Sequence, residues 1–90
     1  MENLETAKLT RISIQNWAKE NDVDLTVLTD ESPSVGLVTV VLMDDLKIFY
    51  YYGYNHILVI KSENMVSIDP VSVGRKISER VIEEIEKYLN

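Results

Sequence analysis

One stretch, residues 35–60, constrains the fold more than any other, because it is apolar at almost every position outside its turns. Its many β-branched and aromatic residues predict three consecutive antiparallel strands. The Asp44-Asp45 pair marks a two-residue connection between the first two strands. Residues 53–55, Gly-Tyr-Asn, mark the second connection, because Gly and Asn tolerate positive φ. The rest of the chain must cover this meander.

The two turns set the register of the strands and therefore the side chains that share each sheet face. We expect Met43 to lie opposite Leu46, and Tyr52 to lie opposite His56. Because side chains alternate along a strand, this register predicts a first face that is an ordinary core. This face is expected to carry Val35, Leu37, Val41, Met43, Leu46, Ile48, Tyr50, Tyr52, Leu58 and Ile60.

The second face is predicted to be apolar as well. An antiparallel sheet with one solvated side normally alternates apolar and polar residues, and this stretch does not. Both faces of the sheet therefore need cover. Lys47 and Lys61 are expected at one end of this face, and Gly36 and Gly53 toward the other. Its apolar residues are expected to be Val38, Val40, Leu42, Phe49, Tyr51, Ile57 and Val59.

Two helical patterns flank the meander. The first helix is predicted over residues 3–20, with Asn3 as its N-cap. The last helix is expected to begin at Asp69-Pro70 or, after a short turn, with Ser72 as its cap. Its apolar residues recur at three and four positions, the spacing of one helix face, and are Val73, Ile77, Val81, Ile85 and Tyr88.

Shorter strands are predicted on both sides of the meander, over residues 24–29 and 65–68, with a loop over residues 30–34. The whole chain, residues 1–90, is then a single α+β domain with four to five antiparallel strands between two helices. A helix about 10 Å wide cannot cover several strands spaced about 4.8 Å apart, so we expect both helices on one sheet face. The second face is left for another subunit, which predicts a homodimer.

The composition excludes several classes of protein. A chain of 90 residues without cysteine has no disulfide, no thiol chemistry and no zinc–thiolate site. It contains no apolar run long enough to cross a membrane and no apolar signal segment at its start. We therefore expect a soluble, cytoplasmic protein without a membrane partner.

The net charge of −6 is concentrated in residues 22–46, which contain six acids and no base. If the first strand pairs antiparallel with the second, Asp22 and Asp24 arrive beside Asp44 and Asp45 at one end of the sheet. We interpret this acidic end as a docking edge for a basic protein. The alternative is that strand ends and turns simply collect Asp. No calcium loop surrounds these residues, so we expect no metal site.

Catalytic and cofactor motifs are absent from the sequence. The single histidine, His56, has no nucleophile with a visible reason to lie near it. The tyrosines around Phe49 resemble a base-stacking platform, but the chain lacks the basic patch that phosphate contacts require. We expect no catalytic residue, no cofactor and no nucleic-acid partner.

Taken together, these features predict a non-enzymatic, acidic, homodimeric binding or regulatory protein, an inhibitor or chaperone-like module that engages a basic protein. The alternative is a small-molecule-binding or enzymatic dimer with a pocket between subunits, formed by His56, Tyr52 and Tyr54. The order of elements resembles small chaperone-type α+β folds such as type III secretion chaperones, which are also acidic dimers. That resemblance concerns the fold and names no function.

Overall fold

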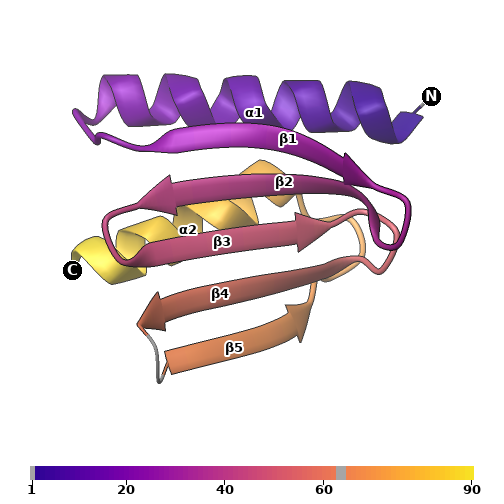
Figure 1. The fold of residues 1–90 in the computed structure, drawn as a ribbon. Helices are drawn as coiled ribbons and strands as arrows, with labels where there is room; N and C mark the ends of the chain where they lie inside the picture. Colours follow the sequence, from indigo (N-terminus) through magenta and orange to yellow (C-terminus); the bar gives the residue numbers. More distant parts are fainter. Residues whose placement is uncertain (1, 63–64) are drawn as a thin grey trace.

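The structure, a computed structural model, describes residues 2–62 and 65–90, and the side chains of these residues from Asn3 onward. Its elements follow the predicted order of a helix, an antiparallel meander and a second helix (Figure 1). They are α1 (Glu2–Glu20), β1 (Thr26–Ser32), β2 (Gly36–Met43), β3 (Leu46–Tyr51), β4 (His56–Ser62), β5 (Met65–Pro70) and α2 (Ile77–Leu89). The predicted α+β class is confirmed.

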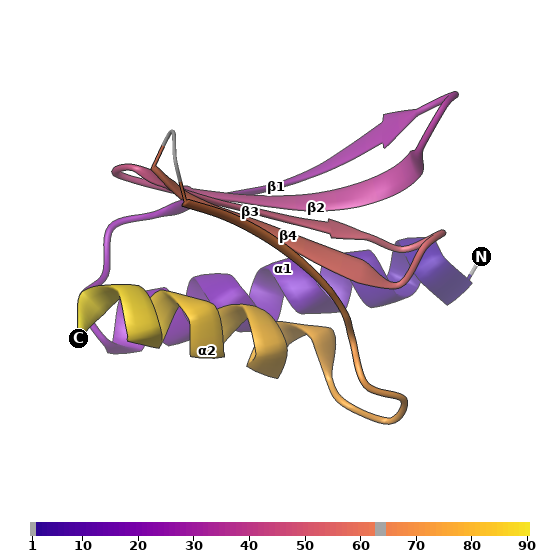
Figure 2. The same ribbon diagram turned by 90° about the horizontal axis from the view of Figure 1, so that it is seen from below.

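The five strands form one antiparallel sheet in which every strand lies beside its neighbours in the sequence. Both helices lie on the same side of this sheet, as expected (Figure 2). Helix α1 packs against β1 and β2, and α2 packs against β3 and against α1. Within the described residues, no element covers the opposite side of the sheet, which we call the uncovered face. Neither described helix combines the length and apolar character needed to span a bilayer.

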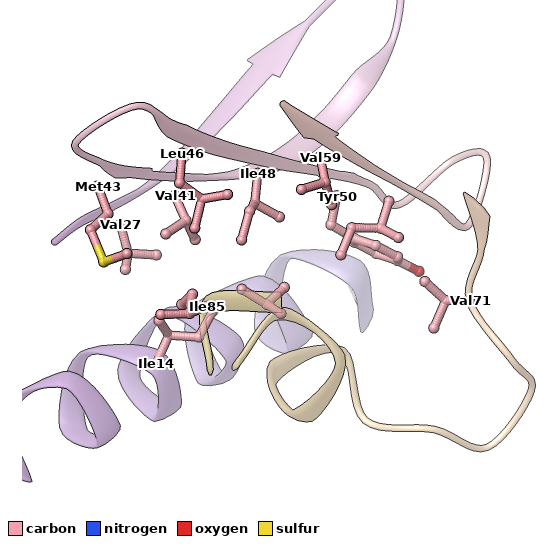
Figure 3. Packing of buried hydrophobic residues seen from close by; sticks show 12 residues of the cluster. Ile14, Val27, Val41, Met43, Leu46, Ile48, Tyr50, Val59, Val71 and Ile85 are labelled. Atoms are coloured by element: carbon pink, nitrogen blue, oxygen red, sulfur yellow. The ribbon is translucent and has the colours of Figure 1, made fainter. Parts of the chain in front are cut away.

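The hydrophobic core lies between the helices and the sheet. Ile14 of α1 and Ile85 of α2 point toward the strands from below, and side chains of β2, β3 and β4 meet them (Figure 3). Each fully buried aliphatic side chain contributes roughly 1.5–3 kcal/mol to folding. The largest side chains that are fully buried and apolar are Ile14, Val41, Leu46, Ile48, Ile57, Val59, Val81 and Ile85.

The register between β2 and β3 is the predicted one. Met43 lies opposite Leu46, and Thr39 lies opposite Tyr50. The two-residue turn between these strands holds Asp44 at a φ of 51°, in the left-handed region that Asp tolerates better than most residues. The local turn chemistry was therefore sufficient to place these two strands.

The predicted register between β3 and β4 is wrong by one residue. His56 lies opposite Tyr51 and not opposite Tyr52, so the connecting turn spans the four residues 52–55. Asn55 takes a positive φ of 52°, as expected, whereas Gly53 does not.

A shift of one residue moves every side chain of a strand to the other face. The structure accordingly places Ile57 and Val59 in the core, where they are fully buried. Leu58 and Ile60, which were expected in the core, lie on the uncovered face instead. The predicted placement of these four residues is wrong.

The predicted ends of several elements also need correction. Asn3 lies inside α1 and does not cap it, because the helix already begins at Glu2. Strand β1 begins and ends later than expected, so the predicted loop shrinks to residues 33–35. Both predictions for the start of α2 are wrong, because Pro70 ends β5 and the N-cap position of the helix is Lys76. Pairing with β4 keeps residues 65–70 extended, and Val71 continues this pairing by donating its N–H to the Asn55 carbonyl at 3.0 Å.

Candidate functional site: the uncovered sheet face

The uncovered face presents apolar side chains from all five strands. The observed registers place alternate residues of each strand on it, beginning with Leu28 on β1 and ending with Ile68 on β5. Its apolar members are Leu28, Val38, Val40, Leu42, Phe49, Tyr51, Leu58, Ile60, Val66 and Ile68.

Five residues predicted for this face lie on it, namely Val38, Val40, Leu42, Phe49 and Tyr51. Their role in an interface stays a prediction. The sequence reasoning missed Leu28, Leu58, Ile60, Val66 and Ile68. The alternation in residues 65–70 was a usable signal for Val66 and Ile68, whereas β4 is apolar at nearly every position and offers no such signal.

Exposure on this face is lowest at two positions of β2 and high on the two outer strands. Val38 and Val40, in the second strand, are only 6% and 7% exposed, because larger neighbours surround them. On the outer strands Leu28 is 43% exposed and Ile68 is 62% exposed. Monomeric proteins rarely expose continuous apolar surface of this extent unless something binds there.

One part of the face is hollowed near the turn between β3 and β4. The hollow has a volume of about 410 Å³ and is lined by Val35, Tyr51, Tyr54, His56, Leu58 and Ile68. His56 Nδ1 lies within hydrogen-bonding distance of the Tyr54 carbonyl oxygen. Because a carbonyl only accepts, Nδ1 donates this bond, and in the neutral ring Nε2 is then left as an acceptor.

The predicted pocket residues are only partly brought together. His56 and Tyr54 line the hollow, but Tyr52 points to the helix side of the sheet. There its hydroxyl forms a hydrogen bond of 2.8 Å with Thr39, and its ring packs edge-on against Tyr50 at 4.7 Å between centroids. Burial, and secondarily the nearby Tyr52, raises the pKa of Tyr50. This tyrosine pair is part of the core and is not open to a ligand on the uncovered face.

Two acidic segments of the chain lead to the same end of the sheet. Thr26 lies opposite Leu42, so the chain entering β1 and the turn leaving β2 meet at the same end. Asp22 and Asp24 precede β1, Asp44 and Asp45 follow β2, and all four are exposed. Their role in docking stays a prediction. Lys47 lies next to the Asp44-Asp45 turn at the border of the uncovered face.

These acids do not form a chelating cluster. Across residues 2–62 and 65–90, no three acidic or histidine side chains are grouped so that they could hold a metal ion.

A second group of charges lies on α2 and the segment just before it. Glu83 accepts a hydrogen bond from Arg75, and Arg80 bonds the buried Glu84 at 2.8 Å. The Arg75 hydrogen bond is the largest cause of the lowered pKa of Glu83, and the charges of Arg75, Lys87 and Arg80 add to it. This network lies on the helix layer, away from the uncovered face.

Comparison with known proteins adds no assignment. No family model matches the chain, and neither a curated protein nor a solved structure shows significant similarity to it. The function must therefore be inferred from the surfaces described above.

Proposed function

We propose that this chain is a non-enzymatic binding protein that works as a homodimer, in which the uncovered faces of two copies pack against each other. The observation that supports this proposal is the apolar sheet face, which crosses all five strands while both helices lie on the other side. Water contact with so many apolar side chains is unfavourable, and a second copy removes it without requiring any other molecule.

The size of the face fits such a contact. Five strands spaced about 4.8 Å apart and about 20 Å long outline roughly 500 Å² in plan, and the accessible area is larger because side chains protrude. A standard stable interface buries about 800 Å² per partner, which is of the same order. Twisted sheets pack face to face about 10 Å apart with their strands rotated by about 30°, so two copies can interdigitate as in a sandwich.

The acidic end supplies the binding function in this proposal. It lies at the end of the sheet and not on the uncovered face, so it stays accessible when two copies pack face to face. We infer that a basic protein docks there and that the dimer acts as an inhibitor or chaperone-like module. Exposed carboxylates raise the rate of encounter with a cationic partner and make its binding sensitive to salt.

A second candidate function is favoured by the hollow that His56 and Tyr54 line. Because this hollow opens on the uncovered face, face-to-face packing would enclose it between subunits, where a small molecule would find apolar walls and the His56 Nε2 acceptor. A dimer structure separates the two functions. Side chains of the second copy that fill the hollow favour the protein-binding function, and an enclosed empty cavity favours the ligand-binding one.

The first experiment is the solution mass by light scattering, over a dilution series from millimolar to submicromolar. At the lower protein concentrations of this series we expect a mass near 21 kDa, which is twice the 10.4 kDa of one chain. A mass of 10.4 kDa at all concentrations would contradict the dimer and would make the uncovered face a site for a different partner.

A further inference from the structure

We propose a second contact between copies of this chain, in which the outer edge of β5 pairs with β5 of another copy and joins the two sheets. Strand β5 is last in the sheet order and has β4 on one side only. None of the described elements lies alongside its outer edge (Figure 1). An edge strand of this kind presents unpaired backbone N–H and C=O groups to any strand that can reach them.

The direction of these backbone groups follows from the pairing with β4. Val71 lies in register with Asn55 and donates its N–H to the Asn55 carbonyl, so the polar groups of Val71 are directed toward the β4 side. In an antiparallel ladder this direction alternates from residue to residue. Ser67 therefore directs its backbone groups toward β4, and Val66 and Ile68 direct theirs outward.

The two edges of the sheet differ in how well they are protected. On the β1 edge, Asp30 and Glu31 are exposed, and α1 packs against this strand. Charged residues and a covering helix are the usual protection of an edge against another strand. Strand β5 has one charged residue, Asp69, and no helix packs substantially against it. Its other side chains include three exposed apolar ones, Met65, Val66 and Ile68.

If a two-fold axis passes through the Ser67 pair, the outward backbone N–H and C=O groups of Val66 and Ile68 all find partners in the second copy. The resulting register places Val66 opposite Ile68 of the second copy, and Ile68 opposite Val66 of the second copy. Each of these pairs exchanges two backbone hydrogen bonds, because both residues direct their groups outward. The side chains of both pairs lie on the uncovered face, so apolar residues meet across the junction.

The same register brings no like charges together. Asp69 lies opposite Met65 of the second copy, which is uncharged. Self-pairing of β1, in contrast, would bring Asp30 and Glu31 of two copies close to each other. Charge therefore favours β5 over β1 as the edge that accepts a second copy.

The edge contact is independent of the face-to-face dimer and is tested at a different side chain. Ser67 lies opposite Val59, a core residue, so its side chain is directed to the helix side of the sheet. Two copies packed through their uncovered faces keep these serines apart. Cross-linking at position 67 therefore reports the edge contact and not the face contact.

The experiment uses Ser67→Cys, which introduces the only thiol into a chain without cysteine. In the proposed register the Cα atoms at position 67 of the two copies are about 4.5 Å apart, a separation that a disulfide accommodates. Mild oxidation should then give a covalent dimer.

The matched control is Met65→Cys, on the same strand and the same side of the sheet. In the proposed register its two copies would be about 13 Å apart along the strands. We expect Met65→Cys to cross-link at least roughly tenfold more slowly. Equal rates for both variants would overturn the proposed pairing.

Two further substitutions in the Ser67→Cys chain complete the test. Ile68→Pro removes an outward N–H that β4 does not use, so the cross-link should disappear while the circular dichroism stays unchanged. A cross-link that persists unchanged would overturn the pairing.

Val40→Lys disrupts the uncovered face and should leave the cross-link in place. Loss of the cross-link in that folded variant would show that it forms through the face and would equally overturn the proposal.

Discussion

The hydroxyl of Tyr50 donates a hydrogen bond to the side-chain oxygen of Asn55, and the side-chain nitrogen of Asn55 donates one of 2.9 Å to the carbonyl of Val71. The backbone of Asn55 accepts a further bond from the Val71 N–H. Asn55 thereby connects the turn after β3, a buried core residue and the segment that leaves β5. It also takes a positive φ of 52°, which Asn tolerates.

Replacement of Asn55 should destabilise the fold in two separable steps. Asn55→Gly keeps the left-handed backbone but leaves the Tyr50 hydroxyl and the Val71 carbonyl without their side-chain partner, and should lower the free energy of unfolding by about 1–3 kcal/mol. Asn55→Ala should cost about 1 kcal/mol more, because its Cβ is strained at positive φ. Urea unfolding followed by circular dichroism measures both. Asn16→Ala, at an exposed helix position, is the control and should have little effect; an Asn55→Gly chain as stable as the parent would contradict the role of the side chain.

Stability should fall in alkaline solution because of Tyr50. Its pKa is raised above the ordinary 10.0, first by burial and then by Tyr52, so the folded chain holds this proton more tightly than the unfolded chain. The resulting stabilisation is complete below the unfolded pKa and is lost as the pH rises through the folded one. Urea unfolding at several pH values above about 9 measures the decline. Tyr50→Phe should reduce it, whereas Tyr54→Phe, on an exposed residue, should not.

The lowered pKa of Glu83 depends first on its hydrogen bond with Arg75. Arg75→Ala should therefore raise the pKa of Glu83 toward its ordinary value of 4.5, as measured by an NMR titration of the carboxyl carbon. In the parent chain, the stabilisation from this carboxylate is present above its ordinary pKa and is lost as the pH falls through the lowered one. Lys76→Ala removes a neighbouring cation and serves as the control. An equal shift in both variants would mean that general charge, and not the Arg75 bond, sets the pKa.

A lysine on the uncovered face should dissociate the dimer. Val40→Lys places a charge at the centre of the face, where its desolvation in an interface is unfavourable. Because Val40 is already sheltered within one chain, Leu42→Lys offers a gentler variant at a more exposed position. At the dilute end of the light-scattering series, both should reduce the solution mass from about 21 kDa to 10.4 kDa while circular dichroism shows a folded chain. Gln15→Lys on the exposed side of α1 is the control, and an unchanged mass for Leu42→Lys would place the interface elsewhere.

Removal of charge at the acidic end should weaken binding of a cationic peptide. Asn is the appropriate replacement, because Asp22 and Asp44 have positive φ values of 58° and 51° that Asn tolerates. The fourfold variant is Asp22→Asn, Asp24→Asn, Asp44→Asn and Asp45→Asn. Each lost charge pair should weaken binding by about 1 kcal/mol or less. The affinity for a lysine-rich peptide at low salt should therefore fall by roughly tenfold or more.

The control for this experiment removes the same number of charges from exposed positions elsewhere. It combines Asp30→Asn, Glu31→Gln, Glu79→Gln and Glu86→Gln. If only net charge matters, both fourfold variants will lose equal affinity, and the acidic end will have no special role. Isothermal titration at two salt concentrations measures the affinities, and the difference between the variants should shrink as salt screens the carboxylates.

Local sequence patterns were enough to predict the elements, their order and the pairing of β2 with β3. Residues 35–60 are rich in β-branched and aromatic side chains, and the Asp44-Asp45 turn is local, so nothing distant was needed to place Met43 opposite Leu46. The width of a helix relative to a sheet was also enough to predict that both helices share one face. The apolar character of the other face followed from the same alternation.

Which side chains of β4 face the core depends on contacts that the pattern along this strand does not reveal. Ile57 and Val59 are chemically equivalent to Leu58 and Ile60, so the pattern along this strand is the same in either orientation. The choice depends on the length of the preceding turn, and Asn55 fixes that length through bonds to Tyr50 and Val71. The same bonds and the β4 ladder hold residues 65–71 extended, and this excludes a helix that begins at Asp69-Pro70. The bonds between Asn55 and Val71 join residues 16 positions apart, and no local pattern records them.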